Sequence, residues 1–142
     1  MRDGPLPPPG GHALKRILIA DDDLSILDGL STLLAADYEV VAVRNGEDLL
    51  IELERRPFDL VLLDLRMPLV KGESALAAIH AGGRTMPIIV MSANRMRIED
   101  ALRRGAAESV AKPFAFAELE EKIERLIGRP ARPPSGATPS TA

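Results

Sequence analysis

A short apolar run that ends in an acid constrains the fold of this chain more than any other stretch. Residues 60–63 are all apolar, Asp64 follows them directly, and the segment lies between Pro57 and Pro68. An unbroken run of this length predicts a strand buried on both faces, as in a parallel sheet covered by helices. Burying one unpaired carboxylate is costly, so we expect Asp64 at the solvent edge of the sheet or beside groups that compensate its charge.

The same order, an apolar run and then acids, occurs near the start of the chain. Residues 16–20 form a largely apolar run that leads into Asp21, Asp22 and Asp23, and apolar side chains then recur at helical spacing over residues 26–34. The acids therefore lie where a predicted strand ends and a predicted helix begins. One of them can cap the helix, which is favourable by about 1 kcal/mol, but capping accounts for one carboxylate and not for three in a row.

Strands and helices alternate along the rest of the chain. We predict further strands at residues 38–43, 87–91 and 109–111, and further helices from 46 to about 55, around 75–79, at 95–104 and at 119–127. Five strands then alternate with five helices, which predicts a parallel sheet with helices on both faces and right-handed crossovers.

Chemically active side chains follow or end four of the five predicted strands. They are the pair Asp21 and Asp22, then Asp64, Ser92 and Lys112. The carboxyl ends of parallel strands meet at one edge of the sheet, where folds of this type bind ligands. We therefore expect these side chains to form one site rather than a set of unrelated loop residues.

This set of side chains suits phosphoryl chemistry assisted by a metal ion. Neighbouring carboxylates repel one another unless they share protons or bind a cation, and oxygen-only ligands favour Mg²⁺ over zinc. A carboxylate beside the metal can act as a nucleophile toward phosphorus. The ammonium of Lys112 and the hydroxyl of Ser92 can then pair with the phosphoryl oxygens.

These motifs resemble the receiver domain of bacterial response regulators, the phosphoproteins of two-component signal transduction. The residues that carry the resemblance are Ile17-Leu18-Ile19-Ala20-Asp21-Asp22, Leu63-Asp64 with Met67-Pro68 and Gly72, Met91-Ser92-Ala93, and Lys112-Pro113-Phe114. The similarity covers about residues 14–128. It implies an α/β, flavodoxin-like, doubly wound sheet of five parallel strands in the order 2-1-3-4-5, with five helices.

The resemblance also implies how phosphorylation proceeds. Asp64 would receive a phosphoryl group from the phosphohistidine of a histidine kinase, and Ser92 and Lys112 would contact that group. A cis peptide bond between Lys112 and Pro113 would orient the lysine. The chain would not be an enzyme beyond catalysing its own phosphorylation and dephosphorylation.

Two further sets of roles follow from the resemblance. Mg²⁺ would be bound by Asp22, Asp64 and the backbone carbonyl of Arg66, with Asp21 acting mainly through water. The side chains of Arg66 and Asn94 would flank the route of the attacking water, which makes them candidates for setting the lifetime of the phosphorylated state.

As a signalling switch, the chain would carry a protein-binding surface that changes on phosphorylation. This surface would comprise the predicted helix at 95–104, the strand at 109–111 and the last helix. The implied partners are a sensor histidine kinase or phosphotransfer protein and a downstream protein target that the sequence does not identify. A homodimer is left open, and neither direct nucleic-acid binding nor membrane insertion is expected.

Three departures from the family pattern stand out. Ser109 occupies the position that usually holds an aromatic switch residue, three positions before the lysine, and Lys71 replaces an acid often found before the loop glycine. No output domain is expected after the last helix, so the chain resembles a stand-alone receiver or a piece of a longer protein.

Two other functions are weighed against the switch. Asp21-x-Asp23 and Ser25 mimic the first motif of an aspartate-nucleophile phosphatase of the haloacid dehalogenase type, but residues 93–97 lack the acidic pair that such enzymes need after a later strand. A constitutive interaction module that no longer responds to phosphate is the third candidate, and the absence of an aromatic residue at Ser109 is its support.

Composition limits the domain organisation and the compartment. The 142 residues are 46% hydrophobic and 27% charged, which suits one soluble domain, and the net charge of −3 does not suggest a nucleic-acid surface. Cysteine is absent, which excludes disulfides and thiolate chemistry. Residues 1–13 and 129–142 are rich in proline and are expected to be disordered arms around a domain at 14–128. No apolar run suits a membrane helix, so we expect a cytoplasmic protein.

Overall fold

A computed structural model describes residues 14–67 and 72–130 of the chain. Its strands are β1 (Arg16–Ala20), β2 (Glu39–Val43), β3 (Leu60–Asp64), β4 (Ile88–Ser92) and β5 (Glu108–Ala111). All pair in parallel and form one sheet in the order β2-β1-β3-β4-β5. The predicted flavodoxin-like fold is confirmed.

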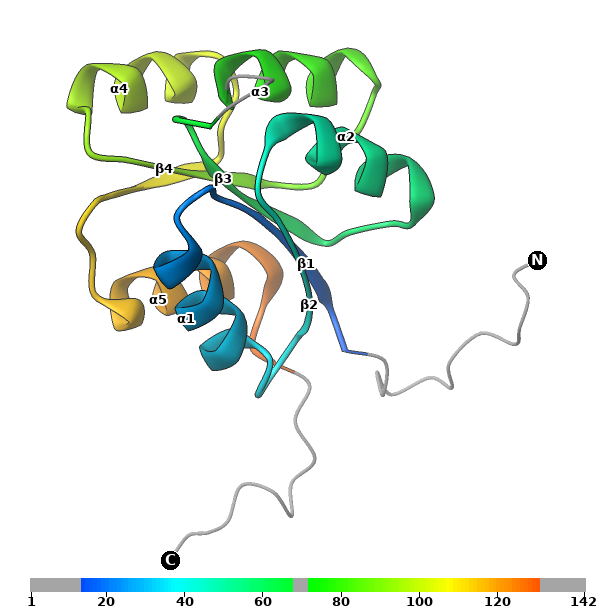
Figure 1. Cartoon of the computed structure of the whole chain (residues 1–142), viewed down its shortest axis with the longest axis vertical. Helices are drawn as coiled ribbons and strands as arrows, with labels where there is room; N and C mark the ends of the chain where they lie inside the picture. The colour runs from blue at the N-terminus through cyan, green and yellow to red at the C-terminus, as the bar shows by residue number, and fades with distance from the viewer. Residues whose placement is uncertain (1–13, 68–71, 131–142) are drawn as a thin grey trace, which may run out of the picture.

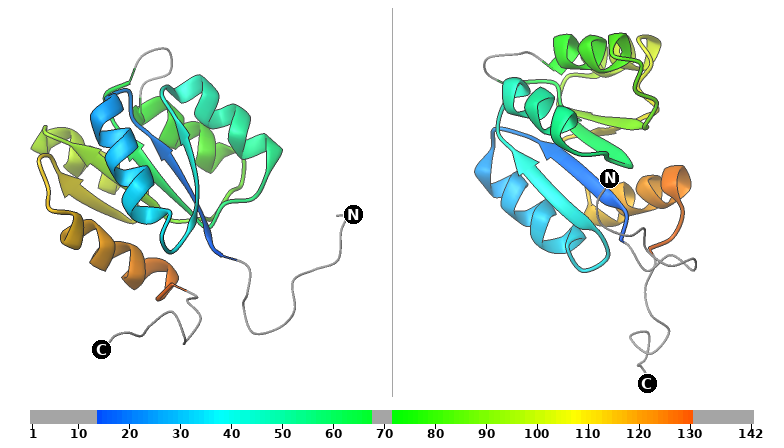
Figure 2. Two further views of the ribbon diagram at one scale, coloured as in Figure 1. Left: turned by 60° about the horizontal axis from the view of Figure 1, so that its bottom comes forward. Right: turned by 90° about the vertical axis from the view of Figure 1, so that its right-hand side faces the viewer.

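Helices cover both faces of this sheet, as each parallel crossover requires. They are α1 (Leu24–Leu34), α2 (Gly46–Arg55), α3 (Gly72–Ala81), α4 (Arg95–Arg103) and α5 (Phe116–Ile127). Figure 1 shows α1 and α5 below the sheet and α2, α3 and α4 above it, and the turned views of Figure 2 show the same three layers.

The central strand β3 explains why its sequence is apolar without a break. Val61 and Leu63 pack in the layer of α2, α3 and α4, whereas Leu60 and Leu62 pack in the layer of α1 and α5. All four side chains are fully buried. An alternating polar pattern would expose polar groups to one of these two cores, so the strand is apolar on both faces.

The strand register brings the predicted site residues to one edge of the sheet. Ala20 pairs with Leu63, Asp64 pairs with Met91, and Ser92 pairs with Ala111. Asp21 and Lys112 directly follow Ala20 and Ala111, so the side chains that follow or end four strands lie at the carboxyl edge.

Side-chain caps begin three of the helices close to this edge. Asp23 accepts hydrogen bonds from the backbone N–H groups of Ser25 and Ile26 and so starts α1. Asn45 and Asn94 cap α2 and α4 in the same manner. Of the three consecutive acids, Asp23 is therefore the one that caps the helix.

Some sequence predictions concern residues outside the described part of the chain. The proposed disordered arm at 1–13, most of the arm at 129–142, and Lys71 all lie there, so these remain predictions. Within the described ranges, none of the helices combines the length and the apolar character needed to cross a membrane.

Candidate active site at the carboxyl edge

Three carboxylates gather where β1 and β3 end. One oxygen each of Asp21, Asp22 and Asp64 lies within 4.8 Å of the others. Asp21 is fully buried and Asp64 is 3% exposed, whereas Asp22 is exposed to solvent. This cluster has two buried acids and one that faces solvent, an arrangement that suits a cation retaining some of its water.

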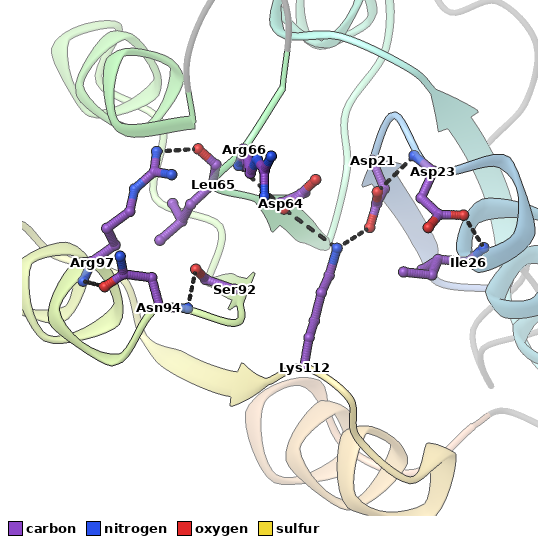
Figure 3. Close-up of polar contacts among 10 residues, drawn as sticks. All are labelled: Asp21, Asp23, Ile26, Asp64, Leu65, Arg66, Ser92, Asn94, Arg97 and Lys112. Atoms are coloured by element: carbon purple, nitrogen blue, oxygen red, sulfur yellow. Dashed lines mark hydrogen bonds and ion pairs between the residues drawn. The ribbon is translucent and has the colours of Figure 1, made fainter.

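Lys112 reaches the two buried acids from the end of β5 (Figure 3). Its Nζ lies 3.0 Å from Asp21 Oδ2 and 3.4 Å from Asp64 Oδ1, and its side chain is 19% exposed. The peptide bond between Lys112 and Pro113 is cis, as the resemblance implied. At these distances, the ammonium of Lys112 compensates part of the negative charge of the cluster.

The electrostatic environment changes the ionisation of both partners. Burial, followed by the negative charge of Asp21, raises the pKa of Asp64 to about 6, although the backbone N–H of Arg66 and the charge of Lys112 act in the opposite direction. Burial alone would lower the pKa of Lys112. Its hydrogen bond to Asp21 and the charges of Asp21 and Asp64 outweigh this effect, and the pKa of Lys112 is raised.

The same local turn orients three of the site side chains. Asp21 Oδ1 accepts from the N–H of Asp23 at 2.9 Å, and Asp64 Oδ1 accepts from the N–H of Arg66 at 3.2 Å. Ser92 Oγ accepts from the N–H of Asn94 at 3.0 Å. Each side chain thus bonds the backbone two residues ahead, a turn that short polar side chains favour, and this bond fixes its direction as the strand ends.

A cavity of about 640 Å³ opens above these residues. It is lined by Asp22, Asp23, Asp64, Arg66, Ser92, Ala93, Asn94, Arg97 and Lys112. The structure thus brings together all the predicted site residues: Asp21 lies at the base of the cluster, and the remainder line the cavity. Asn94, predicted to flank the water route, lines it as well.

Arg97 is a cavity residue that sequence reasoning missed. Its guanidinium Nη2 donates to the backbone carbonyl of Leu65 at 2.5 Å, and its side chain lines the cavity from α4. The signal in the sequence was weak, because Arg95 and Arg97 are the same residue type in the same helical turn. Only the placement of α4 over the end of β3 distinguishes them.

Ser109, the departure at the aromatic position, lies outside this cavity on β5. Its side chain is half-buried, and its backbone carbonyl accepts a hydrogen bond from Lys122 Nζ at 2.5 Å. His80 is exposed on α3, and Met91 packs in the core.

Comparisons with known proteins agree on one family. The family model of the response regulator receiver domain matches residues 17–124. PrrA, a transcriptional regulatory protein of Mycobacterium tuberculosis, is 36% identical over 124 residues, which cover 84% of this chain and 52% of PrrA.

Two solved structures show the same fold. The receiver domain of the sensor histidine kinase PA1611 from Pseudomonas aeruginosa, with a magnesium ion coordinated in its active-site cleft, is 33% identical with a TM-score of 0.72 and covers 82% of this chain and 100% of that one. The response regulator TrrA from Thermotoga maritima, in complex with Mg²⁺ and BeF, is 34% identical with a TM-score of 0.72 and covers 79% of this chain and 98% of that one.

The site and the comparisons together define a receiver domain of two-component signalling. This chain belongs to the response regulator receiver domain family, as its motifs predicted. Family membership favours the receiver hypothesis over the phosphatase alternative. The chain spans about half the length of relatives such as PrrA, which it covers to 52%, so the expected absence of an output domain remains a prediction.

Proposed function

We propose that this chain accepts a phosphoryl group on Asp64 from the phosphohistidine of a sensor kinase or phosphotransfer protein. The observation that carries the proposal is the setting of Asp64, which is buried at a strand end with Asp21 and Asp22 within 4.8 Å and with Lys112 Nζ at 3.4 Å. A nucleophilic carboxylate, two further acids for a cation and an ammonium for the phosphoryl group are thus assembled in one place.

The donor set fits Mg²⁺. Its protein ligands would be the carboxylates of Asp22 and Asp64 and the backbone carbonyl of Arg66, with Asp21 acting through water. The oxygens are all hard ligands, and the exposure of Asp22 leaves room for the waters that Mg²⁺ retains. When bound, Mg²⁺ supplies positive charge that draws the anionic donor and the acidic cluster together.

The residues of the chain then carry out the transfer. A carboxylate oxygen of Asp64 attacks phosphorus, the phosphorus–nitrogen bond of the donor breaks, and its electron pair returns to the imidazole. Lys112 balances the charge of the phosphoryl oxygens. The hydroxyl of Ser92 accepts the N–H of Asn94, so its own proton remains available to donate to a phosphoryl oxygen.

The phosphoryl group is lost again by hydrolysis in the same cavity. Water attacks phosphorus, the bond between phosphorus and the Asp64 oxygen breaks, and inorganic phosphate leaves. Arg66 and Asn94 both line the cavity, and we propose that their side chains restrict the approach of that water.

The proposed reaction also implies a phosphodonor, an output surface and a cellular location. The proposed phosphodonor is a histidine kinase or phosphotransfer protein, and the proposed output is a protein-binding surface made by α4, β5 and α5. A phosphohistidine donor is a cytoplasmic reagent, so the proposal implies a cytoplasmic location.

Phosphorylation by acetyl phosphate in the presence of Mg²⁺ tests the function. We expect an alkali-labile adduct on Asp64, identified by mass spectrometry after borohydride reduction, and no adduct without Mg²⁺ or in Asp64→Asn. Asp28→Asn, which removes an exposed carboxylate from α1, is the matched control and is expected to react like the unmodified chain. An adduct on Asp21 or Asp23, or sustained hydrolysis of varied phosphate esters, would support the phosphatase instead.

A further inference from the structure

Arg97 links the first helical turn of α4 to the backbone that follows the phosphoacceptor. Its Nη2 donates to the carbonyl oxygen of Leu65 at 2.5 Å, and Leu65 is the fully buried residue next to Asp64. Figure 3 shows the side chain extending from α4 along one side of the site to this carbonyl. The side chain of Arg97 can therefore transmit a movement of the backbone at the end of β3 directly to α4.

A second connection runs through the backbone of the same helix. The N–H of Asn94 bonds Ser92 Oγ at 3.0 Å, and the side chain of Asn94 in turn accepts from the N–H of Arg97 at 3.0 Å. The start of α4 is thus fixed to the end of β4 through its cap and to the end of β3 through Arg97. Both strand ends carry residues that would contact the phosphoryl group.

The position of Arg97 complements that of Lys112. Lys112 enters from β5 and lies 3.0 Å from Asp21, and the half-buried Arg97 lines the cavity from α4. A phosphoryl group on Asp64 brings a charge of about −1.5 to −2 and three strong acceptors into this cavity. A guanidinium has five N–H donors in a planar fork, so it can keep a carbonyl partner and also bind phosphoryl oxygens.

We propose that Arg97 is a second cationic ligand of the phosphoryl group, and that this contact draws the first turn of α4 toward Asp64. The inference rests on the proposed function, because it needs a phosphoryl group on Asp64. It adds a binding residue and a physical route by which α4, rather than the side chain at Ser109, responds to phosphorylation.

Arg95 provides a matched control in the same helical turn. It carries the same charge two residues earlier, but it is exposed and is not among the residues that line the cavity. Arg95→Gln and Arg97→Gln therefore make the same change in net charge and in helix composition. Arg97→Lys keeps the charge and loses the fork.

The test measures binding of beryllofluoride, a phosphoryl mimic, to the Mg²⁺-loaded chain by titration of amide chemical shifts. We expect Arg97→Gln to weaken the apparent affinity by about tenfold, the usual loss for a charge-assisted hydrogen bond, and to reduce the shift changes over residues 95–102 by at least half. Arg95→Gln should match the unmodified chain. Arg97→Lys should fall between the two because its charge remains.

Each outcome separates the inference from the function on which it rests. Equal beryllofluoride affinity in Arg97→Gln and Arg95→Gln would overturn the role of Arg97, even if Arg97→Gln melts at a lower temperature, since lost stability alone indicates only the Leu65 contact. Absence of any Mg²⁺-dependent response near Asp64 in the unmodified chain would overturn the proposed function, and the inference with it.

Discussion

Asp64 experiences opposing electrostatic influences that determine when it can act as a nucleophile. Burial and the charge of Asp21 raise its pKa to about 6, while the N–H of Arg66 and Lys112 favour its ionised form. Near neutral pH the carboxylate is therefore mostly ionised, but it loses this form in mildly acidic solution. Keeping Asp64 charged in the folded state therefore lowers the free energy of unfolding of the metal-free chain.

This cost predicts how stability depends on pH without metal. Below about 3.9, the usual carboxyl pKa, Asp64 is protonated in both the folded and unfolded chain. Between that value and about 6, the folded protein holds a proton that the unfolded chain has released, so its free energy of unfolding falls as pH rises. Urea unfolding in EDTA should show the unmodified chain losing stability relative to Asp64→Asn over this interval. A difference that stays constant with pH would contradict the raised pKa.

At the level of elements, much was predictable from the sequence, for reasons visible in particular residues. The unbroken apolar run of β3 predicted strands buried in a parallel sheet. The acids at the ends of β1 and β3 predicted a site at the carboxyl edge of that sheet. The sequence could not predict which of Asp21, Asp22 and Asp23 caps α1 and which two join the acidic cluster. The three residues are identical, and only the backbone conformation sets the direction of each side chain. The reach of Arg97 to Leu65 depends on long-range placement of α4 and has no local signal.

Two adjacent acids are predicted to respond in opposite ways to removal. Asp23→Ala deletes the cap of α1 and should lower the free energy of unfolding by about 1 kcal/mol, with Mg²⁺ affinity nearly unchanged. Asp22→Ala removes an exposed acid from the cluster, so it should stabilise the metal-free chain and weaken Mg²⁺ binding by about tenfold or more. Denaturant unfolding and Mg²⁺ titration of both variants measure this. Equal Mg²⁺ affinity in the two variants would show that Asp22 is not a ligand.

Helix α5 is joined to β5 by side-chain contacts. Lys122 of α5 bonds the carbonyl of Ser109 and lies 3.6 Å from both Glu108 and Glu118, and Arg125 pairs with Glu108 at 3.2 Å. The Lys122–Glu118 pair lies within α5, whereas the contacts with Ser109 and Glu108 join α5 to β5. The side chain of Ser109 is too small to signal a change by moving between buried and exposed positions. If Asp64 is phosphorylated as proposed, we therefore expect α4 rather than α5 to respond.

For the whole molecule, the acidic cluster links metal binding to global stability. A cation that binds the folded chain and not the unfolded one stabilises it by about 2.7 kcal/mol at a concentration 100-fold above its dissociation constant. Mg²⁺ should therefore raise the melting temperature, Asp22→Ala should respond less, and Asp28→Asn should respond as the unmodified chain does. Differential scanning calorimetry across a Mg²⁺ series checks this, and a melting temperature independent of Mg²⁺ would count against the metal site.

The hydrogen bond from Lys15 Nζ to the carbonyl of Ile127, 2.7 Å long, brings the start of β1 next to the end of α5. The first and last elements of the domain therefore abut at the amino edge of the sheet, about five strand residues, or roughly 16 Å, from Asp64. A linker from the end of α5 to the start of β1 would close only a short loop, which costs little conformational entropy. The domain is therefore suited to circular permutation. A short linker across these ends, with new termini opened at the Gly82-Gly83 turn, would leave the phosphoacceptor edge intact while changing the order in which it is synthesised.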